Sequence, residues 1–337
     1  MADTMTPRER LQATIRGEST NRPAWSLWRH FYATEATPEG LAESMLGFQN
    51  AYQFDFMKVN PRASYHVEDW GVAIRYSGDP HRGPSIVEVP VKSAADWRKI
   101  EPLPADQGVL GDHLKALRLI RDGLHGRIPF IMTVFNPLSL AGDLVQSDRA
   151  LIDHLREAPD LVHQGLAAIT ETYVNYTRAI LELGASGLFF ATTSWASRDA
   201  LTVEQYRTFG RPYDLKVLDA AKSAEFNLLH VCGDNDMLFD LADYPVHAVN
   251  WASTSPSNPS IAAAAARLKP ALVAGISREA LTAETADQAL VEARRAREES
   301  GGKHWALGPV CSIPTRSRPE TIQALRDLIT MGGKRWS

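Results

Sequence analysis

The feature that most constrains the fold of this chain is a series of eight short apolar segments separated by long helical patterns. The segments are rich in Val, Ile, Phe and Trp, and they occupy residues 23–28, 54–60, 129–135, 186–192, 226–232, 246–251, 271–275 and 304–308. Their apolar residues run nearly continuously rather than alternating, which is typical of parallel strands covered on both faces. Because strands that alternate with helices form βα units, we expect a parallel sheet.

Eight βα units predict a closed (β/α)₈ barrel, an α/β fold in which residues 1–337 form one domain. An open, doubly wound sheet fits the periodicity nearly as well. That fold would lead us to expect a glycine-rich phosphate loop after its first strand, and SLWRHFYATEATPEG (26–40) contains none. Residues 72–91 alternate in polarity and turn at Gly and Pro, which predicts a β-hairpin inserted after the second strand.

The composition excludes several classes of protein. Hydrophobic residues make up 44% of the chain and charged residues 23%, as in globular proteins. The net charge of −4 and the scattered basic residues argue against a nucleic-acid surface. No segment approaches the roughly 18 unbroken apolar residues of a membrane span, and the N-terminus lacks the apolar core of a signal peptide. Two cysteines make no disulfide framework, so we expect a cytoplasmic protein with reduced thiols.

Those two cysteines are the strongest chemical signal in the sequence. His230 and Cys232 end the fifth expected strand, and side chains two positions apart on a strand point to the same face. Cys311 follows the eighth strand by three residues, so all three side chains are predicted to lie at the rim where barrel enzymes place their active sites. One His and two Cys without a fourth soft ligand match a zinc site with an open position. The alternative is that each cysteine is a buried packing residue.

Polar residues at the ends of other strands are candidates for binding a small-molecule substrate. They are Arg29, His30, Asn60, Arg62, Tyr65, Ser194, Trp195 and Asn250. Arg29 and Arg62 together would suit an anionic substrate group, although each candidate could equally be a hydrogen-bonded loop residue. Asp234 and Asn235, directly after the expected ligands, are candidates for orienting His230 through its other ring nitrogen.

Several motifs along nearly the whole chain resemble the uroporphyrinogen decarboxylase superfamily, whose fold is a (β/α)₈ barrel. They are RERLQATIRGESTNRPAW (8–25), NPLSLAGDL (136–144), ELGASGLFFATTSWAS (182–197), LLHVCGDN (228–235), ALVAGISREALTAETADQALVEARRARE (271–298) and CSIPTRSRPETIQAL (311–325). The superfamily contains decarboxylases and cobalamin-linked methyltransferases, so the resemblance implies two different chemistries.

The decarboxylase motifs are incomplete here. Decarboxylases carry an arginine-rich Met-Arg-Gln-Ala-Gly-Arg segment, whereas the corresponding SLWRHFYATE has Arg29 alone. They also carry an aspartate after the second strand that accepts hydrogen bonds from the pyrrole nitrogens of the substrate. Arg62 takes that place in this sequence, and a cation cannot accept these bonds. A shifted alignment would put Glu68 or Asp69 there, in a different sequence context.

The methyltransferase motif is present. In that branch His-x-Cys and a distant Cys hold zinc, and HVC (230–232) with Cys311 reproduces the pattern. The resemblance therefore implies a zinc-dependent methyltransferase with His230, Cys232 and Cys311 as metal ligands and as the catalytic centre. It also implies cobalamin on a separate corrinoid protein, and a homodimer is common in the superfamily. The alternatives are a decarboxylase, a non-catalytic ligand-binding barrel, and a metal that only clamps the fifth strand to the eighth.

Overall fold

The computed structural model describes residues 4–330, and residues 1–3 and 331–337 of the expected domain lie outside the described residues. Eight strands form one curled parallel sheet in the order β1-β10-β9-β8-β7-β6-β5-β2. The strands are β1 (Ala24–Trp25), β2 (Met57–Val59), β5 (Phe130–Phe135), β6 (Gly187–Ala191), β7 (Leu228–Val231), β8 (Ala248–Trp251), β9 (Ala271–Ile276) and β10 (Trp305–Pro309). Each strand coincides with one of the eight apolar segments, which confirms that part of the prediction.

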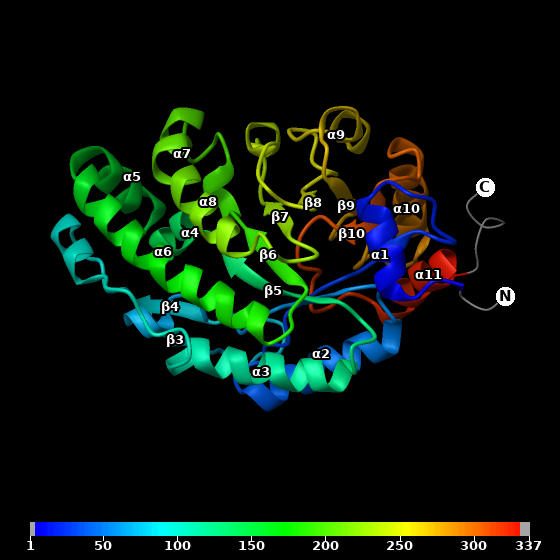
Figure 1. The fold of residues 1–337 in the computed structure, drawn as a ribbon, viewed down its shortest axis with the longest axis horizontal. Coiled ribbons are helices and arrows are strands. Elements are labelled where there is room, and N and C mark those ends of the chain that lie inside the picture. Colours follow the sequence, from blue (N-terminus) through cyan, green and yellow to red (C-terminus); the bar gives the residue numbers. More distant parts are fainter. Residues whose placement is uncertain (1–3, 331–337) are drawn as a thin grey trace.

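Helices follow the strands and surround the sheet (Figure 1). The α-helices are α1 (Pro7–Ile15), α2 (Pro38–Tyr52), α3 (Gly108–Leu124), α4 (Pro137–Asp143), α5 (Asp148–Glu157), α6 (Pro159–Glu182), α7 (Val203–Phe209), α8 (Arg211–Ala220), α9 (Ile261–Arg267), α10 (Asp287–Glu299) and α11 (Pro319–Thr330). Short 3₁₀ helices are η1 (Glu68–Trp70), η2 (Ala94–Lys99), η3 (Thr193–Ala196) and η4 (Leu238–Leu241). Local sequence explains several starts: Thr6, Thr37 and Asn136 each cap a helix whose first residue is proline.

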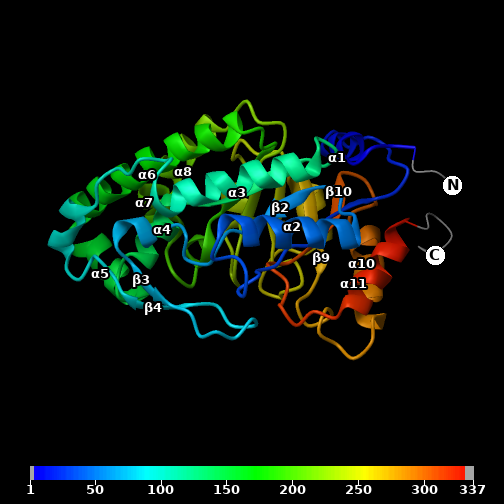
Figure 2. The same ribbon diagram turned by 90° about the horizontal axis from the view of Figure 1, so that it is seen from below.

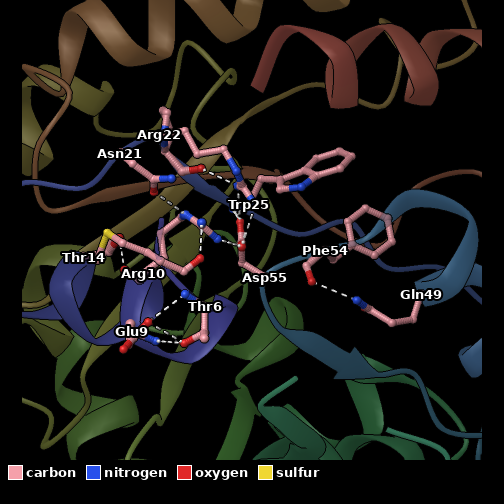
Figure 3. Close-up of polar contacts among 12 residues, drawn as sticks. Thr6, Glu9, Arg10, Thr14, Asn21, Arg22, Trp25, Gln49, Phe54 and Asp55 are labelled. Atoms are coloured by element: carbon pink, nitrogen blue, oxygen red, sulfur yellow. Dashed lines mark hydrogen bonds and ion pairs between the residues drawn. The ribbon is translucent and has the colours of Figure 1, made fainter. Parts of the chain in front are cut away.

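The two ends of the pairing order, β1 and β2, meet through hydrogen bonds around one aspartate (Figure 3). The backbone N–H of Asp55 donates to Trp25 O at 2.9 Å, and the N–H of Trp25 donates to Asp55 Oδ2 at 3.0 Å. Arg10 and Arg22 both form ion pairs with the Asp55 carboxylate, and the Arg10 and Asp55 side chains are fully buried. These bonds connect the two ends of the curled sheet, which is consistent with a (β/α)₈ barrel.

Two buried clusters pack on the two faces of this sheet. The inner cluster includes Trp28, Phe56, Phe189, Phe226 and several strand alanines. The outer cluster lies between the strands and the helices and is much larger. A barrel interior filled by side chains leaves room for a site only at its ends. We therefore expect a cavity at one end of the sheet.

The segment expected to form a hairpin contains β3 (Ala73–Arg75) and β4 (Ser85–Glu88), which pair antiparallel. The chain between them extends along one edge of the molecule (Figure 2). Its tip reaches the loop after β10, where His81 Nδ1 lies 3.1 Å from Thr315 Oγ1. The connection from β2 to β5 thus contributes to the mouth of the barrel-like sheet. Among the described residues, no helix has both the length and the apolar character needed to cross a membrane.

Candidate metal centre

Three potential metal ligands converge at the carboxyl ends of β7 and β10. His230 is part of β7, Cys232 follows that strand directly, and Cys311 lies in the loop after β10. One ligand atom from each residue lies within 4.8 Å of the other two. The structure therefore brings together the three side chains that the sequence singled out, although 79 residues separate the two cysteines.

The donor set and its spacing fit a tetrahedral zinc ion. Two thiolates at Zn–S distances of about 2.3 Å would lie about 3.8 Å apart. The Sγ atoms of Cys232 and Cys311 are 4.0 Å apart, and both side chains are partly exposed to the cavity described below. With His230, the three residues supply one imidazole and two thiolates and leave room for a fourth ligand, as catalytic zinc sites do.

Asn250, at the end of β8, orients His230. Its Oδ1 atom lies 2.6 Å from His230 Nδ1, and its amide donates to the carbonyls of Val273 and Pro309 at 2.6 and 2.8 Å. Since Nδ2 of Asn250 donates these two bonds, Oδ1 accepts a hydrogen bond from the N–H at Nδ1 of His230. The other ring nitrogen, Nε2, is then the one available to a metal.

This arrangement corrects the expectation that Asp234 or Asn235 orients His230. Asp234 Oδ1 accepts a hydrogen bond from Ser255, and the Asn235 amide donates to Asp199. Both residues are exposed and shape the loop after β7. Asn250 was expected to bind substrate, but it is fully buried behind the histidine.

The two thiols share one hydrogen bond, and their pKa values move in opposite directions. The hydrogen bond from Cys232, together with His230, holds the pKa of the Cys311 thiol well below its usual value. The same shared bond and burial raise the pKa of Cys232. Cys311 is thus the more acidic thiol of the pair, and thiolates are the form that binds metal ions.

A cavity of about 630 Å³ opens in front of these three residues. Its walls include Lys58 of β2, Thr133 of β5 and Phe189 of β6. The loops that carry Tyr32 and Arg278 also contribute to its walls. Its size is within the range of small-molecule sites, which runs from roughly 300 to 1,000 Å³.

Of the eight residues expected to bind substrate, the structure places His30 and Asn60 in the wall of this cavity. Arg62 instead forms an ion pair with Glu68. The hydroxyl group of the buried Tyr65 donates a hydrogen bond to Thr133 O at 2.6 Å. Trp195 is buried against Gly142. Arg29, Arg62, Tyr65, Ser194, Trp195 and Asn250 do not line the cavity. Loop position alone did not reveal which way these side chains point.

The sequence profile of the uroporphyrinogen decarboxylase (URO-D) family matches residues 6–331 of this chain. The chain belongs to the URO-D family. The relatives of this chain are methyltransferases and decarboxylases, and this chain is an enzyme as well.

Relatives of this URO-D family chain include both methyltransferases and decarboxylases. Methylcobamide:CoM methyltransferase MtbA of Methanosarcina mazei is 26% identical over 246 residues, which are 68% of this chain and 70% of the relative. Uroporphyrinogen decarboxylase of Syntrophotalea carbinolica is 28% identical over 226 residues, which are 65% and 63%. The solved structure of a methyltransferase from Methanosarcina mazei has a TM-score of 0.82 at 24% identity, over 96% and 98% of the two chains, and shares the fold.

Most residues that line the cavity were not singled out by the sequence analysis, and Lys58 and Thr193 are two of them. Lys58 lies in β2 with only 4% of its surface exposed, and burial lowers the pKa of its ammonium to about 7 against the opposing effects of Cys311 and Glu35. Thr193 adopts a left-handed conformation (φ 44°), which is unusual for a β-branched residue. A signal existed for Lys58, because it is a lone charge within an apolar strand and shares a face with Asn60. None existed for Thr193.

Proposed function

We propose that this chain is a zinc-dependent methyltransferase that moves a methyl group between a methylcobamide, carried on a separate corrinoid protein, and a small thiol or methylated substrate. The observation that carries the proposal is the convergence of His230, Cys232 and Cys311 in the wall of a cavity of about 630 Å³. The methylcobamide:CoM methyltransferases among the relatives support it.

The residues of this chain have separate tasks in the proposed reaction. His230, Cys232 and Cys311 would hold the metal, which would supply Lewis acidity when bound. Asn250 keeps the proton of His230 on Nδ1 and so directs Nε2 toward the metal. The cavity walls hold the substrate and limit the water around its reacting atom. We also propose that the chain is one closed (β/α)₈ domain with the β3–β4 pair inserted after the second strand, and that it forms a homodimer.

Decarboxylation of a tetrapyrrole or another carboxylated substrate is the second candidate, because uroporphyrinogen decarboxylases are also among the relatives. Two features of the cavity disfavour it. The residue at the place of the pyrrole-binding aspartate is Arg62, whose guanidinium is engaged by Glu68. No Asp or Glu among the described residues lines the cavity, so it contains no carboxylate to accept pyrrole N–H bonds.

The first experiment measures zinc by plasma mass spectrometry in the wild type, Cys232→Ser and Cys311→Ser, with Ser312→Ala as a matched control beside Cys311. We expect about one zinc per chain in the wild type and the control, and its loss in both cysteine variants, which still unfold cooperatively. Methyl transfer from free methylcobalamin to a panel of thiols then tests the chemistry.

Each other outcome of this experiment points to a different function. Cysteine variants that fail to fold would indicate a structural clamp between β7 and β10. A wild type that takes up no zinc, even when zinc is supplied, would overturn the methyltransferase proposal, and uroporphyrinogen binding would then be tested.

A further inference from the structure

Asp214, on α8, is a buried carboxylate that the proposed reaction does not use. Its side chain is completely buried, and burial raises its pKa to about 6 against the effects of three hydrogen bonds and of the charge on Arg211. The carboxyl group is therefore ionised at neutral pH and can only accept hydrogen bonds. A buried charge is costly unless it is hydrogen-bonded, so its donors are held firmly in place.

The three donors come from three different parts of the chain. Tyr206 on α7 and Tyr244 after η4 each donate a hydrogen bond from the hydroxyl group to Oδ2 of Asp214 at 2.7 Å. The amide of Asn136, directly before α4, donates to Oδ1 of Asp214 at 2.9 Å and to the Tyr206 hydroxyl at 3.1 Å. Because the carboxylate only accepts, the nitrogen of this amide has to face it. The oxygen of the Asn136 amide then faces α4.

That oxygen fixes the place of Ser139 in the first turn of α4. Oδ1 of Asn136 accepts from the N–H of Ser139 at 3.0 Å and also contacts the Ser139 hydroxyl. The Ser139 hydroxyl in turn lies 2.9 Å from Thr192 O and 2.6 Å from Thr193 Oγ1. Ser139 therefore contacts both residues of the turn that follows β6.

This turn connects the network to the metal centre. The N–H and the hydroxyl of Thr192 both donate to the carbonyl of His230, at 3.0 and 3.1 Å. Thr193 lines the cavity in a left-handed conformation, which persists only where the surrounding structure holds it. One alternative is that the network only packs α4, α7 and α8 together. That role would not depend on the direction in which the Asn136 amide faces.

We propose that Asp214 is a positioning residue of the metal centre. It fixes the direction of the Asn136 amide, which places Ser139 against the turn at residues 192–193. That turn holds the backbone of His230 and one part of the cavity wall. The inference goes beyond the proposed function and rests on it in one respect, because His230 is taken to be a metal ligand.

The test measures zinc affinity at pH 8, above the pKa of about 6 for Asp214, by competition with a chromophoric chelator. An amide at this position no longer dictates the direction of Asn136. We therefore expect Asp214→Asn to weaken zinc binding by about tenfold, the lower end of what the loss of a supporting contact costs a metal ligand. Ser139→Ala should show a similar loss. The double variant should lose about tenfold in total rather than about a hundredfold, because both residues act through one network.

Tyr244→Phe is the matched control. It removes a hydrogen bond from the same carboxylate, but from Oδ2, whereas Asn136 donates to Oδ1. The ionised carboxylate, and with it the direction of the Asn136 amide, stays in place. We expect Tyr244→Phe to lower stability in urea and to keep the zinc affinity of the wild type. Equal losses of zinc affinity in Tyr244→Phe and Asp214→Asn would show that the network only packs helices.

The crystal structure of metal-free Asp214→Asn decides the proposal independently of zinc. We expect Thr193 to leave the left-handed conformation or to lose its contact with Ser139, and an unchanged turn would overturn the proposal. Additive losses in the double variant, or an unchanged zinc affinity in Ser139→Ala, would overturn it as well. Should Asp214→Asn fail to fold, Asp214→Ser takes its place, since serine is too short to reach Asn136. A wild type that takes up no zinc would overturn the proposed function, while the crystal structure would still test the role of Asp214.

Discussion

Asn250 and His230 lie opposite each other on adjacent strands, with Oδ1 of the amide 2.6 Å from Nδ1 of the imidazole. Asn250 is completely buried, and its amide is fixed by two backbone carbonyls. The histidine ring therefore has one orientation and one tautomer before any metal binds. Hydrogen bonds of this kind commonly determine how tightly a metal site holds its ion.

We expect Asn250→Ala to lower zinc affinity by about 10- to 100-fold, because His230 loses the acceptor that sets its tautomer. Competition with a chromophoric chelator measures the affinity. Asp234→Ala is the matched control, since Asp234 follows the ligands in sequence but contacts Ser255. Equal losses in the two variants, or no loss in Asn250→Ala, would contradict the role assigned to Asn250.

Asp55→Ala should destabilise the fold by about 3–5 kcal/mol, because it leaves the Arg10 and Arg22 guanidinium groups in the buried join between β1 and β2 without their carboxylate. Urea unfolding followed by circular dichroism measures the loss. Glu18→Ala removes the partner of Arg16 at an exposed position and should change stability little. Similar midpoints for Asp55→Ala and the wild type would show that the join does not depend on this cluster.

Gly142→Ala should cost about 1–3 kcal/mol, because a β-carbon on α4 would overlap the buried indole of Trp195. Gly47, in the middle of α2, has no atom within 4 Å of the corresponding position. Gly47→Ala should therefore stabilise the protein by about 0.5–1 kcal/mol through helix propensity. Thermal unfolding of both variants gives the sign of each effect, and a loss of stability in both would refute the packing argument.

His113 should make the fold less stable in mild acid. Its Nε2 accepts from the N–H of Arg62 and its Nδ1 donates to Val109 O, so the buried ring is neutral. Burial lowers its pKa from 6.5 to about 4. The unfolded chain therefore takes up this proton first, and the stability contributed by the neutral ring is present above pH 6.5 and is lost as the pH falls toward 4.

The difference in unfolding free energy between the wild type and His113→Gln isolates this effect, because the other titrating groups are common to both. We expect the difference to shrink by about 3 kcal/mol between pH 7 and pH 4, following about 1.4 kcal/mol for each pH unit. Parallel stability curves for the two proteins across this range would show that His113 is not titrated in this way.

The order of strands and helices was readable from the sequence, since all eight strands of the sheet coincide with apolar segments. So was the convergence of His230, Cys232 and Cys311, because strand geometry puts i and i+2 on one face and parallel strands end at a common rim. These predictions depend on local periodicity and on chain connectivity, which a single sequence contains in full.

The tertiary structure alone decided which polar side chains face the cavity. Arg62 forms an ion pair with Glu68, six residues later, and Asn250 forms a hydrogen bond with His230 on the adjacent strand. Lys58 donates a hydrogen bond to Asn60 and lies over the ring of Phe189. A polar side chain turns toward whichever partner offers the best hydrogen bond after desolvation, and most of those partners come from distant strands. The sequence by itself therefore determined the scaffold and the metal ligands. The folded structure determined what orients the ligands and which polar side chains line the cavity.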